Sequence, residues 1–102
     1  ALALGGEGAV GSSYNFAAPL YHRLINAFFA EDLEKAQTEQ FHSVELIKLL
    51  SSYGYLSASK ALMGMLGIKV GNPRLPIPPL TSGQIKQLRT DLEQLGFFNW
   101  IK

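Results

Sequence analysis

Apolar residues recur at helical spacing along most of the chain, and the first such run predicts a helix that ends near Ala30. This helix is expected to begin near Ala17 or Ala18, with Pro19 in its first turn, where the missing N–H costs nothing. Its apolar face comprises Leu20, Leu24, Ile25 and Phe28. Glu31 and Asp32 mark a break, and Asp32 is the expected N-cap of a second helix.

The second helix is the longest, running to about Tyr53 before Gly54 stops it. Its expected buried stripe is Leu33, Ala36, Val44, Ile47 and Leu50. Ser57 can cap a shorter third helix, closed by Gly67, whose apolar residues are Ala61, Leu62, Met65 and Leu66.

A capping box formed by Thr81 and Gln84 opens the last predicted helix, and Gly96 ends it. Its apolar face comprises Ile85, Leu88, Leu92 and Leu95. The preceding stretch, residues 72–80, has four prolines in nine positions and predicts an extended, stiff connector. Residues 97–102, FFNWIK, are too apolar for a free tail, so we expect them to dock on a core or a partner.

The N-terminal residues give a different pattern. Residues 1–6, ALALGG, resemble the tail of a helix stopped by glycine, so we expect the chain to begin in the middle of a longer fold. Ala9 and Val10, between glycines and followed by Ser12, predict one short strand running into a loop. Because a lone strand cannot satisfy its own backbone hydrogen bonds, this strand should pair with residues outside the chain.

Composition narrows the class of protein. The 102 residues suffice for one domain, and 47% hydrophobic with 17% charged residues is typical of a globular protein. Nine basic and eight acidic residues leave a net charge of +1 without a basic stripe, which argues against a nucleic-acid partner. No apolar run approaches the roughly 18 residues of a membrane helix. The absence of cysteine excludes disulfides and thiolate metal sites and fits a reducing compartment.

Gly6, Gly8 and Gly11 reproduce the G-x-G-x-x-G spacing of dinucleotide-binding loops. That motif needs a buried strand before it, a helix start after it, and an acidic residue ending a second strand. Here only Ala1 to Leu4 precede the glycine-rich run that begins at Gly5, and no strand leads to Glu31 or Asp32. The spacing therefore does not indicate a nucleotide site.

Isolated reactive side chains have plain structural explanations. Lys60 lies in an otherwise apolar and small-residue helix, where its stem can pack while its amine stays in water. His22 and His42 lack metal-binding spacing and are expected on helix surfaces. Arg74, among prolines, is expected to tether its loop to helix C-termini or to a carboxylate. The carboxylates form no convincing acid–base pair and are expected on polar helix faces: Glu31, Glu34, Glu39, Glu45, Asp91 and Glu93.

The Gly11-Ser12-Ser13 stretch is the most informative candidate. A glycine lets a ligand approach the backbone, and two hydroxyls at the end of a strand can hydrogen-bond a polar substrate. A serine-rich turn without function explains the same residues equally well.

The order of these signals, GAVGSSYN, two long helices, a short helix, R-L-P and a final helix, closely resembles the C-terminal part of N-acetylneuraminate lyases. These enzymes group with dihydrodipicolinate synthases in a superfamily of pyruvate-handling (β/α)₈ barrels. The resemblance covers essentially the whole chain. GAVGSSYN is its most specific motif, since R-L-P is shared across the superfamily.

The resemblance implies an α/β fold: residues 1–30 would supply the last strand and helix of a (β/α)₈ TIM barrel, and residues 31–102 a three-helix C-terminal extension. The segment itself is then mostly helical. Barrels of this kind take about 250 residues and carry their active sites at the C-terminal ends of the strands. Ser12 and Ser13 would lie at such an end.

The activity implied is that of a class I aldolase, which cleaves N-acetylneuraminate reversibly to N-acetylmannosamine and pyruvate through a Schiff base. The resemblance also implies a cytoplasmic homotetramer that needs no metal or organic cofactor. The Schiff-base lysine, about 40 residues before Ala1, and the proton-relaying tyrosine would both precede this sequence. Tyr14 and Lys60 do not match their motif positions, so the segment alone is predicted to be inactive.

Three residues carry over by motif position. Ser12 matches the serine that hydrogen-bonds the polyhydroxylated part of the sugar, and Gly11 keeps that approach open. Ile77, just after R-L-P, falls where the extension can reach the mouth of the pocket. Ser13 replaces the commoner threonine and keeps its hydroxyl. The alternatives are another pyruvate-dependent aldolase, a dihydrodipicolinate synthase relative, or a non-enzymatic helical interaction module.

Overall fold

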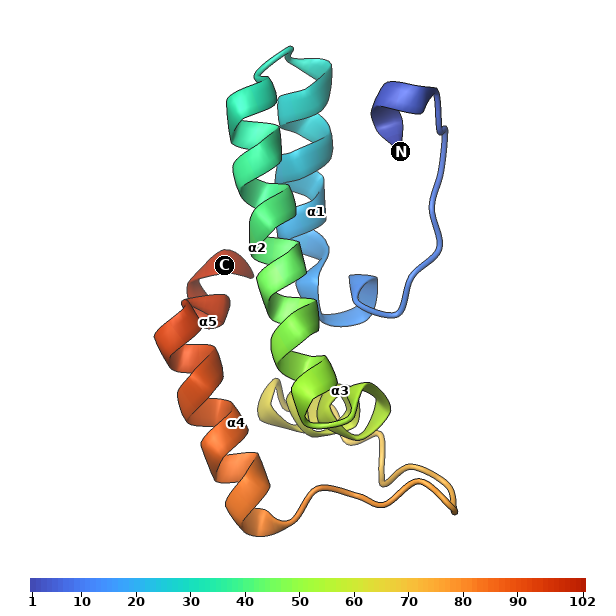
Figure 1. Ribbon diagram of the computed structural model, residues 1–102, viewed down its shortest axis with the longest axis vertical. Coiled ribbons are helices and arrows are strands. Elements are labelled where there is room, and N and C mark those ends of the chain that lie inside the picture. The colour runs from blue at the N-terminus through green and yellow to red at the C-terminus, as the bar shows by residue number, and fades with distance from the viewer.

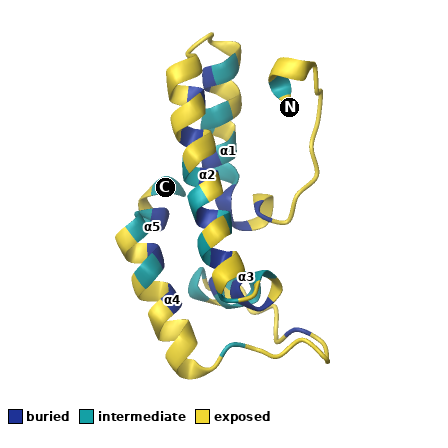
Figure 2. Cartoon of the chain, viewed as in Figure 1, coloured by how far each residue is buried: buried dark blue, intermediate teal, exposed yellow.

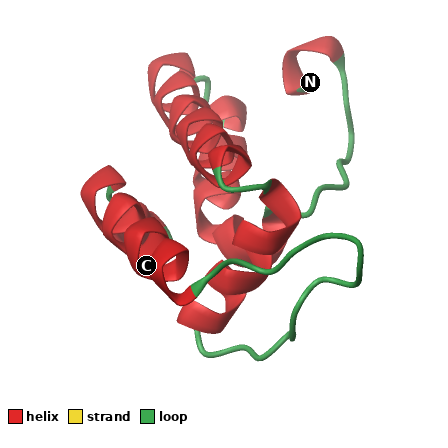
Figure 3. Ribbon diagram, turned by 60° about the horizontal axis from the view of Figure 1, so that its bottom comes forward, coloured by secondary structure: helices red, strands yellow, loops and turns green.

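The helix ends follow from local capping signals in the sequence. A computed structural model describes all 102 residues, and every regular element in it is helical (Figures 1 and 3). The elements are the short 3₁₀ helix η1 (Leu2–Leu4) and the α-helices α1 (Tyr14–Phe29), α2 (Leu33–Ser52), α3 (Tyr55–Met65), α4 (Ser82–Leu95) and α5 (Phe97–Trp100).

Four predicted helix boundaries are confirmed. The Asp32 side chain accepts a backbone N–H at 3.1 Å at the start of α2, and Thr81 and Gln84 form the complete capping box of α4. Gly54 and Gly96 follow α2 and α4 with φ of 89° and 93°, a left-handed backbone that glycine adopts without penalty. Gly5, with φ of 87°, likewise ends η1, as the ALALGG pattern predicted.

Two predicted starts differ from the structure. Helix α1 begins at Tyr14, three residues early, but Ala17 has non-helical φ and ψ of −129° and 24°, and Pro19 lies two residues after this kink. Helix α3 begins at Tyr55 with Gly54 as its N-cap, so the prediction that Ser57 caps it is wrong. The Ser57 hydroxyl instead donates to the Pro78 carbonyl at 2.6 Å and ties the proline-rich connector to α3.

The strand predicted around residues 9–12 is absent. This part of the chain is irregular, Val10 is fully exposed, and the N-terminal arm lies apart from the helices in Figure 1. A strand requires a neighbouring strand to accept and donate its backbone hydrogen bonds, and this chain contains none.

Helices α1 and α2 form a hairpin, and α3, α4 and α5 pack against one end of it. Helices α1 and α2 are antiparallel neighbours, α3 crosses the far end of α2, and α4 returns beside α2 so that α5 reaches α1 as well (Figure 1). No helix is both long and apolar enough to cross a membrane.

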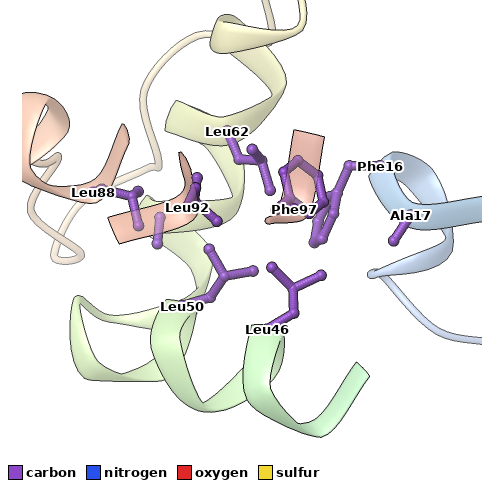
Figure 4. Packing of buried hydrophobic residues seen from close by; sticks show 9 residues of the cluster. Phe16, Ala17, Leu46, Leu50, Leu62, Leu88, Leu92 and Phe97 are labelled. Atoms are coloured by element: carbon purple, nitrogen blue, oxygen red, sulfur yellow. The ribbon is translucent and has the colours of Figure 1, made fainter. Parts of the chain in front are cut away.

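The core lies where α2, α3, α4 and α5 meet the start of α1 (Figure 4). Its members are Phe16, Ala17, Leu46, Leu50, Ala58, Leu62, Leu88, Leu92 and Phe97. Phe97 is fully buried, and Phe98, Trp100 and Ile101 pack against the same cluster, so the predicted docking of FFNWIK is confirmed on the chain's own core.

The buried face of α2 differs from the predicted stripe. Leu33 and Val44 are exposed by 57% and 38%, whereas two polar side chains, Glu39 and Ser43, are buried. The buried residues of α2 are Ala36, Glu39, Ser43, Leu46 and Leu50. Figure 2 shows buried positions of α2 along its contact with α1. The helical spacing of the buried residues was predicted correctly, but the side of α2 that is buried could not be found from apolar residues alone.

Candidate functional site

The turn that contains Gly11, Ser12 and Ser13 joins the N-terminal arm to α1. Ser13 is buried, and its Oγ lies 2.7 Å from the Tyr21 hydroxyl, which in turn lies 2.8 Å from Ser43 Oγ on α2. This chain of three hydroxyls ties the turn to both long helices. It also explains why Ser43 is buried, because its polar atom has a hydrogen-bond partner.

Ser12, beside it, is exposed and has a different partner. Its Oγ lies 2.7 Å from the hydroxyl of Tyr55, the first residue of α3, which is 43 residues further along the chain. The two adjacent serines therefore face different elements.

Gly11 packs against an aromatic ring, which leaves little room for a side chain at this position. A Cβ at this position would lie 3.2 Å from the Tyr14 ring, tighter than most real Cβ contacts. The Tyr14 ring in turn packs edge-on against Tyr21, with centroids 4.6 Å apart. Gly11 thus has a packing requirement in addition to the open approach predicted for it.

A half-open hollow of about 780 Å³ lies beside this turn, between the N-terminal arm and the outer faces of α1 and α2. Gly11 and Ser13 line it, together with Leu24, Ile25 and Phe28 of α1. The apolar face predicted for α1 is therefore only partly covered, and Ile25 is 39% exposed. Ser12 does not line this hollow.

Three other residues singled out from the sequence lie outside this turn: Ile77, Arg74 and Lys60. Ile77 is 39% exposed in a turn of the connector, where its N–H donates to the Arg74 carbonyl at 3.1 Å, and it does not line the hollow beside α1. The Arg74 side chain is exposed and takes part in no ion pair, so the predicted tether is not formed. Lys60 is half-buried and its Nζ lies 3.4 Å from the Val70 carbonyl, consistent with a packed stem and a polar contact at its tip.

One carboxylate prediction and one histidine prediction were wrong. Glu39 is buried on α2, where Arg23 donates to its two oxygens at 2.9 and 3.3 Å. His42 stacks on the indole of Trp100 with centroids 4.2 Å apart, and its Nδ1 lies 3.7 Å from Glu39. Only His22 is exposed on a helix surface as predicted.

Two groups in the bundle have shifted pKa values. Burial opposes the ionisation of Glu39, but the hydrogen bond and charge of Arg23, with His42, outweigh it and hold the pKa of Glu39 below its ordinary value. The Tyr53 hydroxyl donates to Asp91 at 2.5 Å, and this hydrogen bond, with burial, raises the pKa of Tyr53 to about 12. Both groups join helices rather than line the turn.

The hydrogen-bond partners of the two serines were not predicted from the sequence. Tyr21 and Tyr55 supply the hydroxyls that hold Ser13 and Ser12, but tyrosine on a helix is a common packing residue and gives no motif. The turn thus presents one exposed serine hydroxyl, that of Ser12, whereas the Ser13 hydroxyl is buried and Gly11 lies against the Tyr14 ring. A serine hydroxyl can hydrogen-bond a polar ligand.

Comparison with known proteins identifies the family. The sequence model described as the Dihydrodipicolinate synthetase family matches residues 1–95. The chain belongs to this family. The resemblance drawn from GAVGSSYN and the helix order is therefore confirmed.

Within the family, the chain is similar to several N-acetylneuraminate lyases. It is 34% identical over 102 residues to the lyase of Rattus norvegicus, covering 98% of this chain and 32% of that protein. It superposes on the solved structure of the Proteus mirabilis lyase with a TM-score of 0.87 and 38% identity, covering 94% of this chain and 32% of that one. It is also 30% identical over 95 residues to the 4-hydroxy-tetrahydrodipicolinate synthase of Corynebacterium diphtheriae, covering 93% of this chain and 32% of that protein. The chain spans about a third of the length of these relatives.

Proposed function

We propose that this chain is the C-terminal third of a class I aldolase that reversibly cleaves N-acetylneuraminate to N-acetylmannosamine and pyruvate. The observation that carries the proposal is similarity to N-acetylneuraminate lyases along the whole chain, in sequence and in structure.

In this proposal, residues 1–30 end a (β/α)₈ barrel and residues 31–102 form its helical extension. One feature supports it: the hollow beside α1 has a largely apolar lining, which the preceding part of the barrel would cover. Residues 9–12 are irregular in this chain and, in the proposal, form a strand once a neighbouring strand satisfies their backbone groups.

The site residues keep the roles given by the resemblance. Ser12 hydrogen-bonds the polyhydroxylated part of the sugar, Gly11 leaves room for it, and Ile77 lies at the mouth of the pocket. The partners are small molecules, sialic acid and pyruvate. By the same resemblance, the full-length protein is a cytoplasmic homotetramer.

The reactive amine is expected on a lysine about 40 residues before Ala1. Its attack on the ketone of the 2-keto acid expels water and forms an iminium. In cleavage, the iminium of the sialic acid accepts the electron pair of the broken carbon–carbon bond and becomes an enamine. In the reverse direction, the enamine of pyruvate donates that pair to the aldehyde carbon of the sugar. Borohydride reduces that iminium to a stable secondary amine. Trapping therefore reports the proposed chemistry directly.

The test is borohydride trapping of the full-length protein with pyruvate, followed by peptide mass spectrometry. We expect one adduct per protomer, on a lysine that precedes this chain. Lys60→Arg is the matched control and should trap equally well, because the Lys60 amine contacts the Val70 carbonyl. No adduct, or an adduct on Lys60, would contradict the proposal.

A second candidate is a synthase-type or other pyruvate-dependent activity, favoured by the similarity to the Corynebacterium diphtheriae synthase. Both candidates would trap pyruvate, so the trap does not separate them. Cleavage assays on N-acetylneuraminate and on other 2-keto-3-deoxy acids do. We expect N-acetylneuraminate to be the better substrate, because Gly11 and Ser12 follow the lyase motif.

A further inference from the structure

We infer that Tyr55 is a positioning residue that fixes the hydroxyl of Ser12 for binding the polyhydroxylated part of the substrate. The inference rests on the role proposed for Ser12 above. The observation that carries it is the 2.7 Å contact between the Tyr55 hydroxyl and Ser12 Oγ. Tyr55 belongs to the helical extension, so this contact links the extension to the turn.

The Tyr55 side chain is held in place by its surroundings. It is the first residue of α3, directly after Gly54, whose φ of 89° turns the chain from α2 into α3. Its side chain is half-buried and packs against the central apolar cluster, and its carbonyl accepts the Ser59 hydroxyl at 2.7 Å. The phenol oxygen is therefore held in place where it contacts the Ser12 hydroxyl.

The backbone under Ser12 is fixed independently. Ser13 is buried and hydrogen-bonded to Tyr21, and through it to Ser43. The remaining freedom at Ser12 is the rotation of its own side chain. The contact with Tyr55 selects one of the three staggered positions of that side chain.

A serine hydroxyl has one hydrogen and two lone pairs. The bond to Tyr55 uses one of these, so Ser12 keeps the capacity to bond a hydroxyl of the ligand. Without the phenol oxygen, substrate binding must itself order the Ser12 side chain, which weakens binding. The reaction at the ketone is unaffected, because Ser12 contacts the sugar part.

The test is Tyr55→Phe in the full-length protein, assayed in the condensation direction, where the two substrates vary independently. We expect KM for N-acetylmannosamine to rise about 2- to 10-fold, the effect of one net hydrogen bond. KM for pyruvate and kcat should stay unchanged. Tyr53→Phe is the matched control, since its hydroxyl bonds Asp91, and it should leave all three constants unchanged.

A double-mutant cycle with Ser12→Ala shows whether the effect passes through Ser12. In that background, Tyr55→Phe should have no further effect on KM. Three outcomes would each overturn the inference while leaving the proposed function intact. The KM for the sugar stays unchanged in Tyr55→Phe, or kcat falls while KM rises for both substrates, or the variant does not fold. A wild-type protein that traps no pyruvate and does not cleave N-acetylneuraminate would overturn the proposed function, and this inference with it.

Discussion

At the level of single residues, Glu39 shows how a buried charge is accommodated between α1 and α2. Arg23 on α1 donates to both of its oxygens, and His42, on Glu39's own helix, lies one turn away with Trp100 stacked on its ring. An ionised carboxylate is costly to bury alone, but it is tolerated when a guanidinium pairs with it in this two-point geometry. This ion pair fixes the register of the hairpin at its middle.

Glu39→Gln should destabilise the full-length protein in a pH-dependent way. The folded-state pKa of Glu39 lies below its ordinary value of 4.5, so its stabilisation is complete above that pH and is lost as the pH falls through the folded-state value. At pH 7 the variant should lose about 1–3 kcal/mol, the cost of leaving a charged partner unpaired. Melting midpoints of the two proteins should differ at neutral pH and converge in acid.

A gap that persists unchanged at pH 3 would show that the ionisation of Glu39 is not what stabilises the hairpin. Glu34→Gln is the matched control, because Glu34 lies on the exposed side of the same helix. It should shift the melting midpoint little at either pH.

At the level of elements, the capping box of Thr81 and Gln84 sets where the proline-rich connector ends and α4 begins. The Thr81 hydroxyl accepts the Gln84 N–H at 3.2 Å, and the Gln84 side chain accepts the Thr81 N–H at 2.9 Å. These bonds satisfy donors that a helix start otherwise leaves unpaired. Helix α4 carries Leu88 and Leu92 into the core, so its start also sets their depth.

Thr81→Ala should lower stability by about 0.5–2 kcal/mol, while Thr81→Ser should cost little because it keeps the accepting oxygen. Thermal unfolding of the two variants in the full-length protein gives the comparison. Equal losses in both would mean that the threonine methyl group, rather than its hydroxyl, matters at this position.

The same elements show what the sequence alone can predict. The ends at Asp32, Gly54, Thr81 and Gly96 were predicted because a cap is a signal carried within about four residues. The strand predicted near Val10 does not form, because this chain holds no other strand to pair with it. The buried side of α2 was predicted wrongly, because the burial of Glu39 depends on Arg23, a partner on another helix.

For the candidate site too, local features could be predicted from the sequence and contacts between distant residues could not. Gly11 and Ser12 were predicted as site residues from a local motif, and the comparisons confirm the family that this motif indicated. The contact of Ser12 with Tyr55 had no local signature, because the two residues are 43 positions apart in the chain. Roles that depend on such contacts require the fold before they can be assigned.

At the level of the whole molecule, little of the chain is buried. Only 17 of 102 residues are buried, and the central apolar cluster has nine members, which is a small core for a domain of this length. Several large apolar side chains remain exposed, among them Val10, Ile25 and Phe29. The proposed barrel would cover the outer face of α1, and a self-sufficient helical module would have no need of such cover.

The 102-residue chain expressed alone therefore separates the two architectures. If it is part of a barrel, we expect the isolated chain to bind the dye ANS, to aggregate, and to melt without a cooperative transition, because the lining of the hollow beside α1 stays in contact with water. The full-length protein should bind little dye and melt cooperatively, which provides the internal control. A monodisperse isolated chain with a sharp melting transition and no dye binding would favour the helical interaction module, since its existing core would then suffice to hold the helices together.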